Sequence, residues 1–151
     1  MKPLHVRLAA WGTVLVLALI AATVRVGADE VYEGVNGPQL NGTTSQGRAI
    51  WLVAADDRVR EIRMAWRFRC DGGVRVEPLG MTARDTGAGF DQLDGGRFRF
   101  EDRRHLAGRD GDGAEVDVRI EGDARRGTSS AEIRLAGATC RSGPVRWATR
   151  G

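Results

Sequence analysis

The stretch Glu61–Cys70, EIRMAWRFRC, constrains the fold most strongly because apolar and charged side chains alternate along it. One face carries Ile62, Met64, Trp66, Phe68 and Cys70. The other face carries Glu61, Arg63, Arg67 and Arg69. Successive side chains of a strand point to opposite faces, so this period of two predicts a half-buried antiparallel strand. A slip of one residue would bury three arginines, and the register is therefore strongly fixed.

Shorter runs with similar patterning follow, separated by Gly, Asp and Pro. The run RAIWLVA is apolar on both faces, and ADDR leads from it into the long strand as a hairpin turn. Further strands are expected at 74–78, 95–102, 114–122, 127–137 and 143–149. About seven to eight strands with this spacing predict an all-β fold, either an antiparallel β-sandwich or a small barrel. Residues 79–95 are expected to form an irregular loop, which is either functional or mobile.

The N-terminal residues have the layout of a secretory signal peptide. A basic start is followed by an uncharged apolar stretch at residues 8–24, and small residues precede Asp29. We therefore expect residues 1–28 to be a signal helix and residues 29–151 to be a single β-sandwich domain. The apolar stretch is close to the length that spans a bilayer, so an uncleaved anchor through residues 8–24 is the alternative.

The charge balance depends on this segment. The chain has 23 Lys and Arg against 20 Asp and Glu, and residues 1–28 contribute three of the cations and none of the acids. The remaining chain is neutral, which argues against a nucleic-acid partner because such binding needs a basic surface. Contact with a membrane is expected only through an uncleaved N-terminal segment. The expected partner lies outside the cell or in the envelope.

Two cysteines, Cys70 and Cys140, stand in a chain that is expected to be exported. An even number of cysteines in an oxidising compartment predicts one disulfide. Two separate buried thiols are the alternative. The disulfide would close a long loop and contribute about 4 kcal/mol in the chain-entropy model. The chain is accordingly expected to be secreted or extracytoplasmic.

The sequence contains few residues in patterns typical of catalysis. His105 is the one histidine after residue 28, and a triad with Ser129, Ser130 or Ser142 has neither a G-x-S-x-G elbow nor an evident orienting acid. A zinc site needs several His or Cys ligands. We therefore interpret His105 as a solvated loop residue and expect no enzymatic activity, cofactor or metal.

The stretch GRDGDGAEVDVRIE offers Asp110 and Asp112 as calcium ligands. A helix–loop–helix calcium loop in this register needs an acid and then Gly where the chain has Ala114 and Glu115. Asp-Gly repeats are also typical of tight hairpin turns, which is the favoured interpretation. A looser calcium site in a β-hairpin is left open.

Outward arginines form a candidate binding surface for an acidic envelope polymer. It consists of Arg63, Arg67, Arg69, Arg97 and Arg99. These residues form one stripe only if their strands are neighbours. The alternative is cross-strand pairing with the outward acids Asp117 and Glu121, which the neutral charge favours.

The segment TTSQG precedes the first apolar strand and contains a candidate loop, Ser45 and Gln46. Its hydroxyls can bond to nearby backbone, and Gly47 permits a turn, so we interpret it as a structural lead-in. A binding role for Ser45 and Gln46 is the alternative.

Taken together, TTSQGRAIWLV, WRFRC-DG, GGRF, RRGTSSAEIRL and CRSGPVRW resemble a pattern in small exported proteins of high-GC bacteria. The likeness covers most of residues 42–148 and implies a β-rich domain without an established function. It carries no catalytic residue. We expect an exported non-catalytic binding or structural domain. Alternatives are a membrane-tethered envelope module, a small hydrolase or protease inhibitor acting through the 79–95 loop, and a small-ligand carrier with an apolar interior.

Overall fold

A computed structural model describes residues 37–107 and 113–150, where the regular secondary structure is β-strand apart from two short 3₁₀ turns. The strands are β1 (Gln39–Thr44), β2 (Ala49–Ala55), β3 (Arg58–Trp66), β4 (Arg69–Cys70), β5 (Leu79–Arg84), β6 (Phe90–Gln92), β7 (Phe98–Leu106), β8 (Ala114–Gly122), β9 (Arg126–Leu135), β10 (Ala138–Arg141) and β11 (Val145–Arg150). The turns are η1 (Asp71–Gly73) and η2 (Asp94–Gly96). The predicted all-β class is confirmed.

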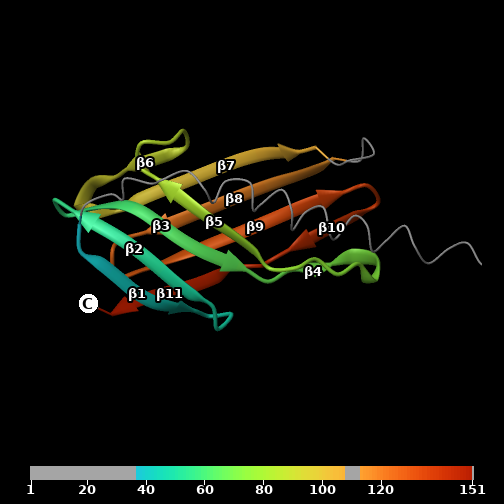
Figure 1. The fold of residues 1–151 in the computed structure, drawn as a ribbon, viewed down its shortest axis with the longest axis horizontal. Helices are drawn as coiled ribbons and strands as arrows, with labels where there is room; N and C mark the ends of the chain where they lie inside the picture. Colours follow the sequence, from blue (N-terminus) through green and yellow to red (C-terminus); the bar gives the residue numbers. More distant parts are fainter. Residues whose placement is uncertain (1–36, 108–112, 151) are drawn as a thin grey trace, which may run out of the picture.

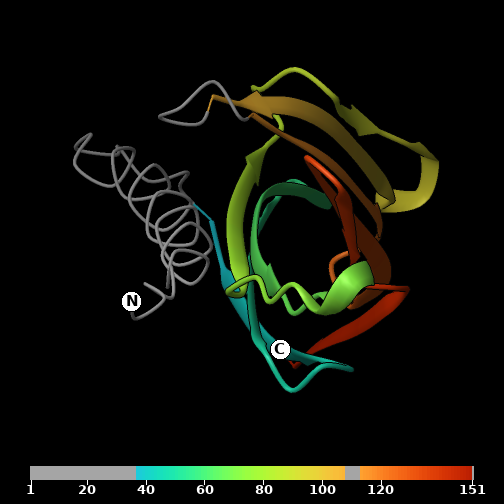
Figure 2. The same ribbon diagram turned by 90° about the vertical axis from the view of Figure 1, so that its right-hand side faces the viewer.

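The strands form one antiparallel sheet with the order β5, β3, β2, β1, β11, β9, β8, β7, β6 (Figure 1). The short strand β10 pairs with both β9 and β4 beside this path. Viewed at right angles, the sheet curls around and nearly closes into a barrel (Figure 2). Of the two expected forms, the curled sheet corresponds to the small barrel.

The core lies inside the curl because each strand turns alternate apolar side chains inward. The strand predicted at 61–70 is divided into β3, which ends at Trp66, and β4 at Arg69–Cys70. Within β3 the expected alternation holds for Ile62, Met64 and Trp66, which are buried. Phe98 is completely buried and stacks on Phe90 at a ring distance of 5.2 Å. The two rings therefore fill part of the barrel interior.

Trp147 shows how close the packing is. Its ring lies 6.3 Å from that of Phe98, and a side chain added at Gly127 would approach it to 2.3 Å. Gly127 faces Gly122 in the β8–β9 pair, where an added side chain would also meet the ring. The two glycines therefore make room for the indole, which explains their position at this end of the hairpin.

Several expected boundaries are wrong. Residues 74–78 are a connecting segment and not a strand, and the expected irregular loop at 79–95 contains β5 and β6. Leu79, Met81 and Ala83 face inward in β5, but intervening Gly80 and Thr82 weaken the alternating signal. The described residues therefore contain eleven strands, where seven to eight were expected.

Some expectations concern other parts of the chain. The signal segment at residues 1–28 and the anchor at residues 8–24 lie outside the described residues, as do Asp110 and Asp112. Across residues 37–107 and 113–150, no helix has the length and apolar character needed to span a membrane.

The predicted disulfide is confirmed and joins two parts of the barrel. Cys70 of β4 and Cys140 of β10 are directly opposite each other in the antiparallel pair and are bonded through sulfur. Since β4 follows β3 while β10 returns from β9, the bond links the two sides of the sheet at one end of the barrel. A disulfide is consistent with an extracytoplasmic location.

Candidate functional site

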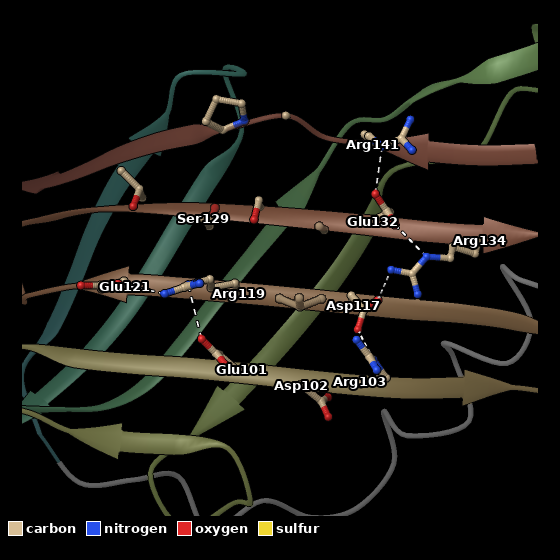
Figure 3. Close-up of a pocket in the computed structure, with 16 residues that line it drawn as sticks. Glu101, Asp102, Arg103, Asp117, Arg119, Glu121, Ser129, Glu132, Arg134 and Arg141 are labelled. Atoms are coloured by element: carbon tan, nitrogen blue, oxygen red, sulfur yellow. Dashed lines mark hydrogen bonds and ion pairs between the residues drawn. The ribbon is translucent and has the colours of Figure 1, made fainter.

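The outer face of β7, β8 and β9 carries a hollow of about 870 Å³ (Figure 3). Its floor is formed mainly by outward side chains of these strands. Its wall is formed by Arg141 at the end of β10 and by Gly143 and Pro144 after it. The wall exists because the strand opposite β9 is interrupted. Both β10 and β11 pair with β9, and residues 142–144 separate them.

Ser142 holds the interruption in place. Its hydroxyl accepts a hydrogen bond from the Ala131 backbone N–H at 2.9 Å and donates one to the Gly143 carbonyl at 2.7 Å. Its own N–H bonds to the Ala131 carbonyl at 2.9 Å. Gly143 has φ of 66°, which favours glycine. The hollow's wall is thus specified by the residue pair Ser142–Gly143.

Charged side chains alternate in sign across the floor. Arg134 of β9 lies 2.8 Å from Asp117, 2.8 Å from Glu132 and 3.2 Å from Glu115. Arg141 then reaches Glu132 at 2.9 Å. Each carboxylate is shared between arginines, so the surface is a neutral lattice and not a cationic patch.

The lattice fixes the protonation state of its members. A hydrogen bond from Arg103 lowers the pKa of Asp117, and the charges of Arg103 and Arg134 outweigh the opposing effect of burial. The same hydrogen bond and charge from Asp117 raise the pKa of Arg103. Both groups therefore stay ionised at neutral pH.

Arg119 is the most loosely held arginine of the floor. Its contacts are 3.4 Å to Glu101 and 3.8 Å to Glu121, and its side chain is 57% exposed. Ser130 stands opposite Arg119 in β9, and exposed Thr128 lies two residues away. The centre of the hollow therefore presents a guanidinium and two hydroxyls to solvent, which is suited to a polar partner.

The expected arginine stripe does not form. Arg63 lies on β3 and Arg67 and Arg69 follow it, whereas Arg99 lies on β7 and Arg97 immediately before it. Strands β3 and β7 are not neighbours in the sheet. The prediction of a stripe required the two arginine-bearing strands to be neighbours. The observed strand order places β3 and β7 apart.

The cross-strand alternative holds for Arg97 and Arg99. Arg97 lies 2.8 Å and Arg99 3.6 Å from Glu121, their expected acidic partner. Asp117 instead pairs with Arg103 and Arg134.

Glu61 was expected on the exposed charged face but is only 2% exposed. It accepts hydrogen bonds from Arg63 at 2.5 Å and from Arg84 of β5 at 2.7 Å. Burial opposes its ionisation, but the bonds and charges of Arg84 and Arg63 outweigh burial and lower its pKa. The strand pattern predicted neither the burial nor the role of Arg84, because residues 79–84 were not recognised as a strand.

Ser45 and Gln46 both bond to distant backbone. The Ser45 hydroxyl accepts a bond from the Arg146 N–H at 3.1 Å. The Gln46 amide oxygen accepts from the Arg67 N–H at 2.8 Å, and its nitrogen donates to the Arg67 carbonyl at 3.0 Å and to the Ser142 carbonyl at 3.2 Å. The lead-in is therefore hydrogen-bonded to the connection between β3 and β4 and to the segment between β10 and β11.

The histidine and serines of the hypothetical triad are dispersed. His105 is exposed on β7 opposite Glu115, and buried Ser129 accepts a bond from the Trp66 indole N–H at 3.0 Å. Ser130 aligns across the sheet with Glu101, four residues or about 13 Å along β7 from His105. No group of three or more metal-ligating side chains occurs in the described ranges.

The hollow uses residues that the sequence analysis did not single out, including Arg119, Glu132 and Arg134. Their outward direction follows from the same alternation that placed Val116, Val118 and Ile120 in the core. The wall at 142–144 had no comparable signal. No protein-family model, curated protein or solved structure matches the chain.

Proposed function

We propose that the chain is an exported, non-catalytic binding module that contacts an extracellular or envelope partner through the hollow on β7–β9. The observation that carries this proposal is the loosely held Arg119 with Ser130 and Thr128, surrounded by a lattice of shorter ion pairs. A partner with complementary polar groups can bind Arg119 without breaking the short ion pairs around Arg134. Side chains that are already held by ion pairs favour binding because less order must be created on association.

Blocking the hollow tests the proposal. Ser130→Arg places a large cation at its exposed centre, while Thr86→Arg adds the same charge in the exposed segment between β5 and β6. The exported protein is titrated onto the purified envelope fraction of its producing cells, and the bound fraction is measured by sedimentation. We expect saturable, salt-sensitive binding that Ser130→Arg abolishes and Thr86→Arg retains. Equal binding by the two variants would exclude the hollow as the contact surface.

A further inference from the structure

Trp51 is a second feature of the surface that packing does not explain. It is 43% exposed, and it is the one exposed large hydrophobic side chain within residues 37–107 and 113–150. Trp66 and Trp147 are buried. Ile50 and Leu52 on either side of Trp51 are completely buried, so the alternation of β2 holds the indole on the outer face.

The strand register surrounds Trp51 with polar side chains. Asn41 of β1 stands opposite it on one side and Arg63 of β3 on the other. The same row continues to Thr82 of β5 and, past Asn41, to Arg150 of β11. Five strands at the usual spacing make this row roughly 19 Å long. All five side chains belong to exposed residues.

Arg63 is held in place beside the indole. Its Nε donates to the buried Glu61 carboxylate at 2.5 Å, although 53% of the Arg63 side chain is exposed. The carboxylate also binds Arg84 at 2.7 Å. Glu61 therefore fixes a guanidinium at the edge of the aromatic surface and offsets its charge, which keeps this part of the row from being strongly cationic.

We propose that this row is a binding platform for a saccharide chain, with Trp51 stacking on a sugar ring. The face of an indole is electron-rich and attracts the polarised C–H groups that cover one face of a sugar. Amide, hydroxyl and guanidinium groups at its sides match the hydroxyls around the ring. A lipid or apolar peptide would need a larger apolar surface than this, because the row contains a single large apolar side chain among polar ones. An acidic substituent on the saccharide would meet Arg150.

This platform is separate from the hollow. Trp51 on β2 is separated from β9, the nearest strand of the hollow, by β1 and β11. The row reaches β11 at Arg150, four residues along that strand from Arg146, which stands opposite Thr128 of the hollow. Substitutions in one surface therefore leave the other intact, and the two proposals fail independently.

The test uses the exported protein and a fixed set of saccharide probes. These are the hexamers of β-1,4-linked glucose and N-acetylglucosamine, purified peptidoglycan and polygalacturonate. Calorimetry follows the soluble probes and sedimentation follows peptidoglycan. We expect at least one probe to bind, with Trp51→Ala weakening it tenfold or more and Trp51→Phe weakening it less. Ser130→Arg is the matched control and leaves this binding unchanged.

Other outcomes overturn the proposal. Binding to none of the probes, or equal binding by wild type and Trp51→Ala, would exclude a saccharide platform. Dimerisation that Trp51→Ala abolishes, measured by light scattering, would assign the surface to a second copy of the chain. Binding to phosphatidylcholine vesicles that depends on Trp51 would assign it to a lipid surface. Thermal melting checks that Trp51→Ala, at an exposed position, remains folded.

Discussion

In the connection between β3 and β4, the side-chain amide of Gln46 makes the hydrogen bonds that the backbone of a neighbouring strand would otherwise make. It pairs with both the N–H and the carbonyl of Arg67, as a residue on a neighbouring strand would, and also bonds to the Ser142 carbonyl. One side chain thus connects the first hairpin, the long strand and the break before β11. The segments TTSQG and CRSGPVRW therefore meet in space at this point.

Replacing Gln46 tests this role. We expect Gln46→Ala to lower the free energy of unfolding by about 1–3 kcal/mol, since several backbone groups lose their partner. Gln46→Glu keeps the size but removes the donors to Arg67 and Ser142, and is expected to destabilise as well. Urea denaturation measures both, with Gln39→Ala at an exposed position of β1 as control. Midpoints equal to wild type would exclude the connecting role.

Glu61 predicts a specific dependence of stability on pH. Its pKa in the folded protein is lower than the ordinary value of 4.5, so its contribution is present above that value and is lost as the pH falls through the folded pKa. At neutral pH we expect Glu61→Gln to cost about 1–3 kcal/mol, because two charge-assisted hydrogen bonds are weakened. Chemical denaturation at a series of pH values should show this difference shrinking in acid. A difference that stays constant down to low pH would contradict the assigned ion pairs.

These two residues also mark the limit of sequence interpretation at the residue scale. The alternation in EIRMAWRFRC correctly placed Glu61 on the outer face. It could not predict the bond from Arg84, because Gly80 and Thr82 weaken the apolar alternation of β5 and this strand was not recognised. Gln46 was recognised as part of a structural lead-in. Its partners are distant in sequence, so no local pattern identified them.

At the scale of elements, the hairpin of β2 and β3 is the element that the local sequence predicted most directly. Asp56 and Asp57 form its two-residue turn with φ of 53° and 59°, the left-handed values of a type I′ turn. Glycine adopts such values without the steric cost that a side chain brings. The ADDR segment therefore predicted the turn, although Asp57 is not the best residue for its second position.

This geometry gives a prediction for the turn. Asp57→Gly is expected to raise the free energy of unfolding by up to about 1 kcal/mol because it removes the strain of positive φ. Asp57→Val is expected to lower it, because β-branched residues tolerate this region poorly. Thermal melting of the two variants measures the difference. Destabilisation by glycine together with tolerance of valine would show that the turn has another conformation.

At the scale of the whole molecule, the disulfide is expected to stabilise the end of the barrel where β4 pairs with β10. The Cys70–Cys140 bond spans 70 residues of sequence and joins β4 to β10. The double variant Cys70→Ser/Cys140→Ser is expected to lose about 4 kcal/mol because the unfolded chain gains freedom. Denaturant titration compares it with the oxidised wild type, and reduced wild type should match the double variant. A loss below roughly 1 kcal/mol would mean that the hydrogen-bonded strands alone close the barrel end.

The all-β class and the disulfide were predictable because they depend on periodicity and on the number of cysteines. The curl of the sheet was offered as one of two forms, and the order of strands was not predicted. That order depends on pairs such as β1 with β11, whose residues are about a hundred positions apart. The expected arginine stripe failed for this reason, since strands alike in sequence lie on separate parts of the barrel.

We propose that the protein is exported and that its nearly closed barrel, with the Cys70–Cys140 disulfide at one end, acts outside the cytoplasm. The most direct test is the intact mass of the protein from the medium and from membranes, with alkylation before and after reduction. We predict a secreted species that begins at Asp29 and gains two alkyl groups only after reduction. A species that is alkylated at both cysteines without reduction and remains inside the cell would contradict the claim.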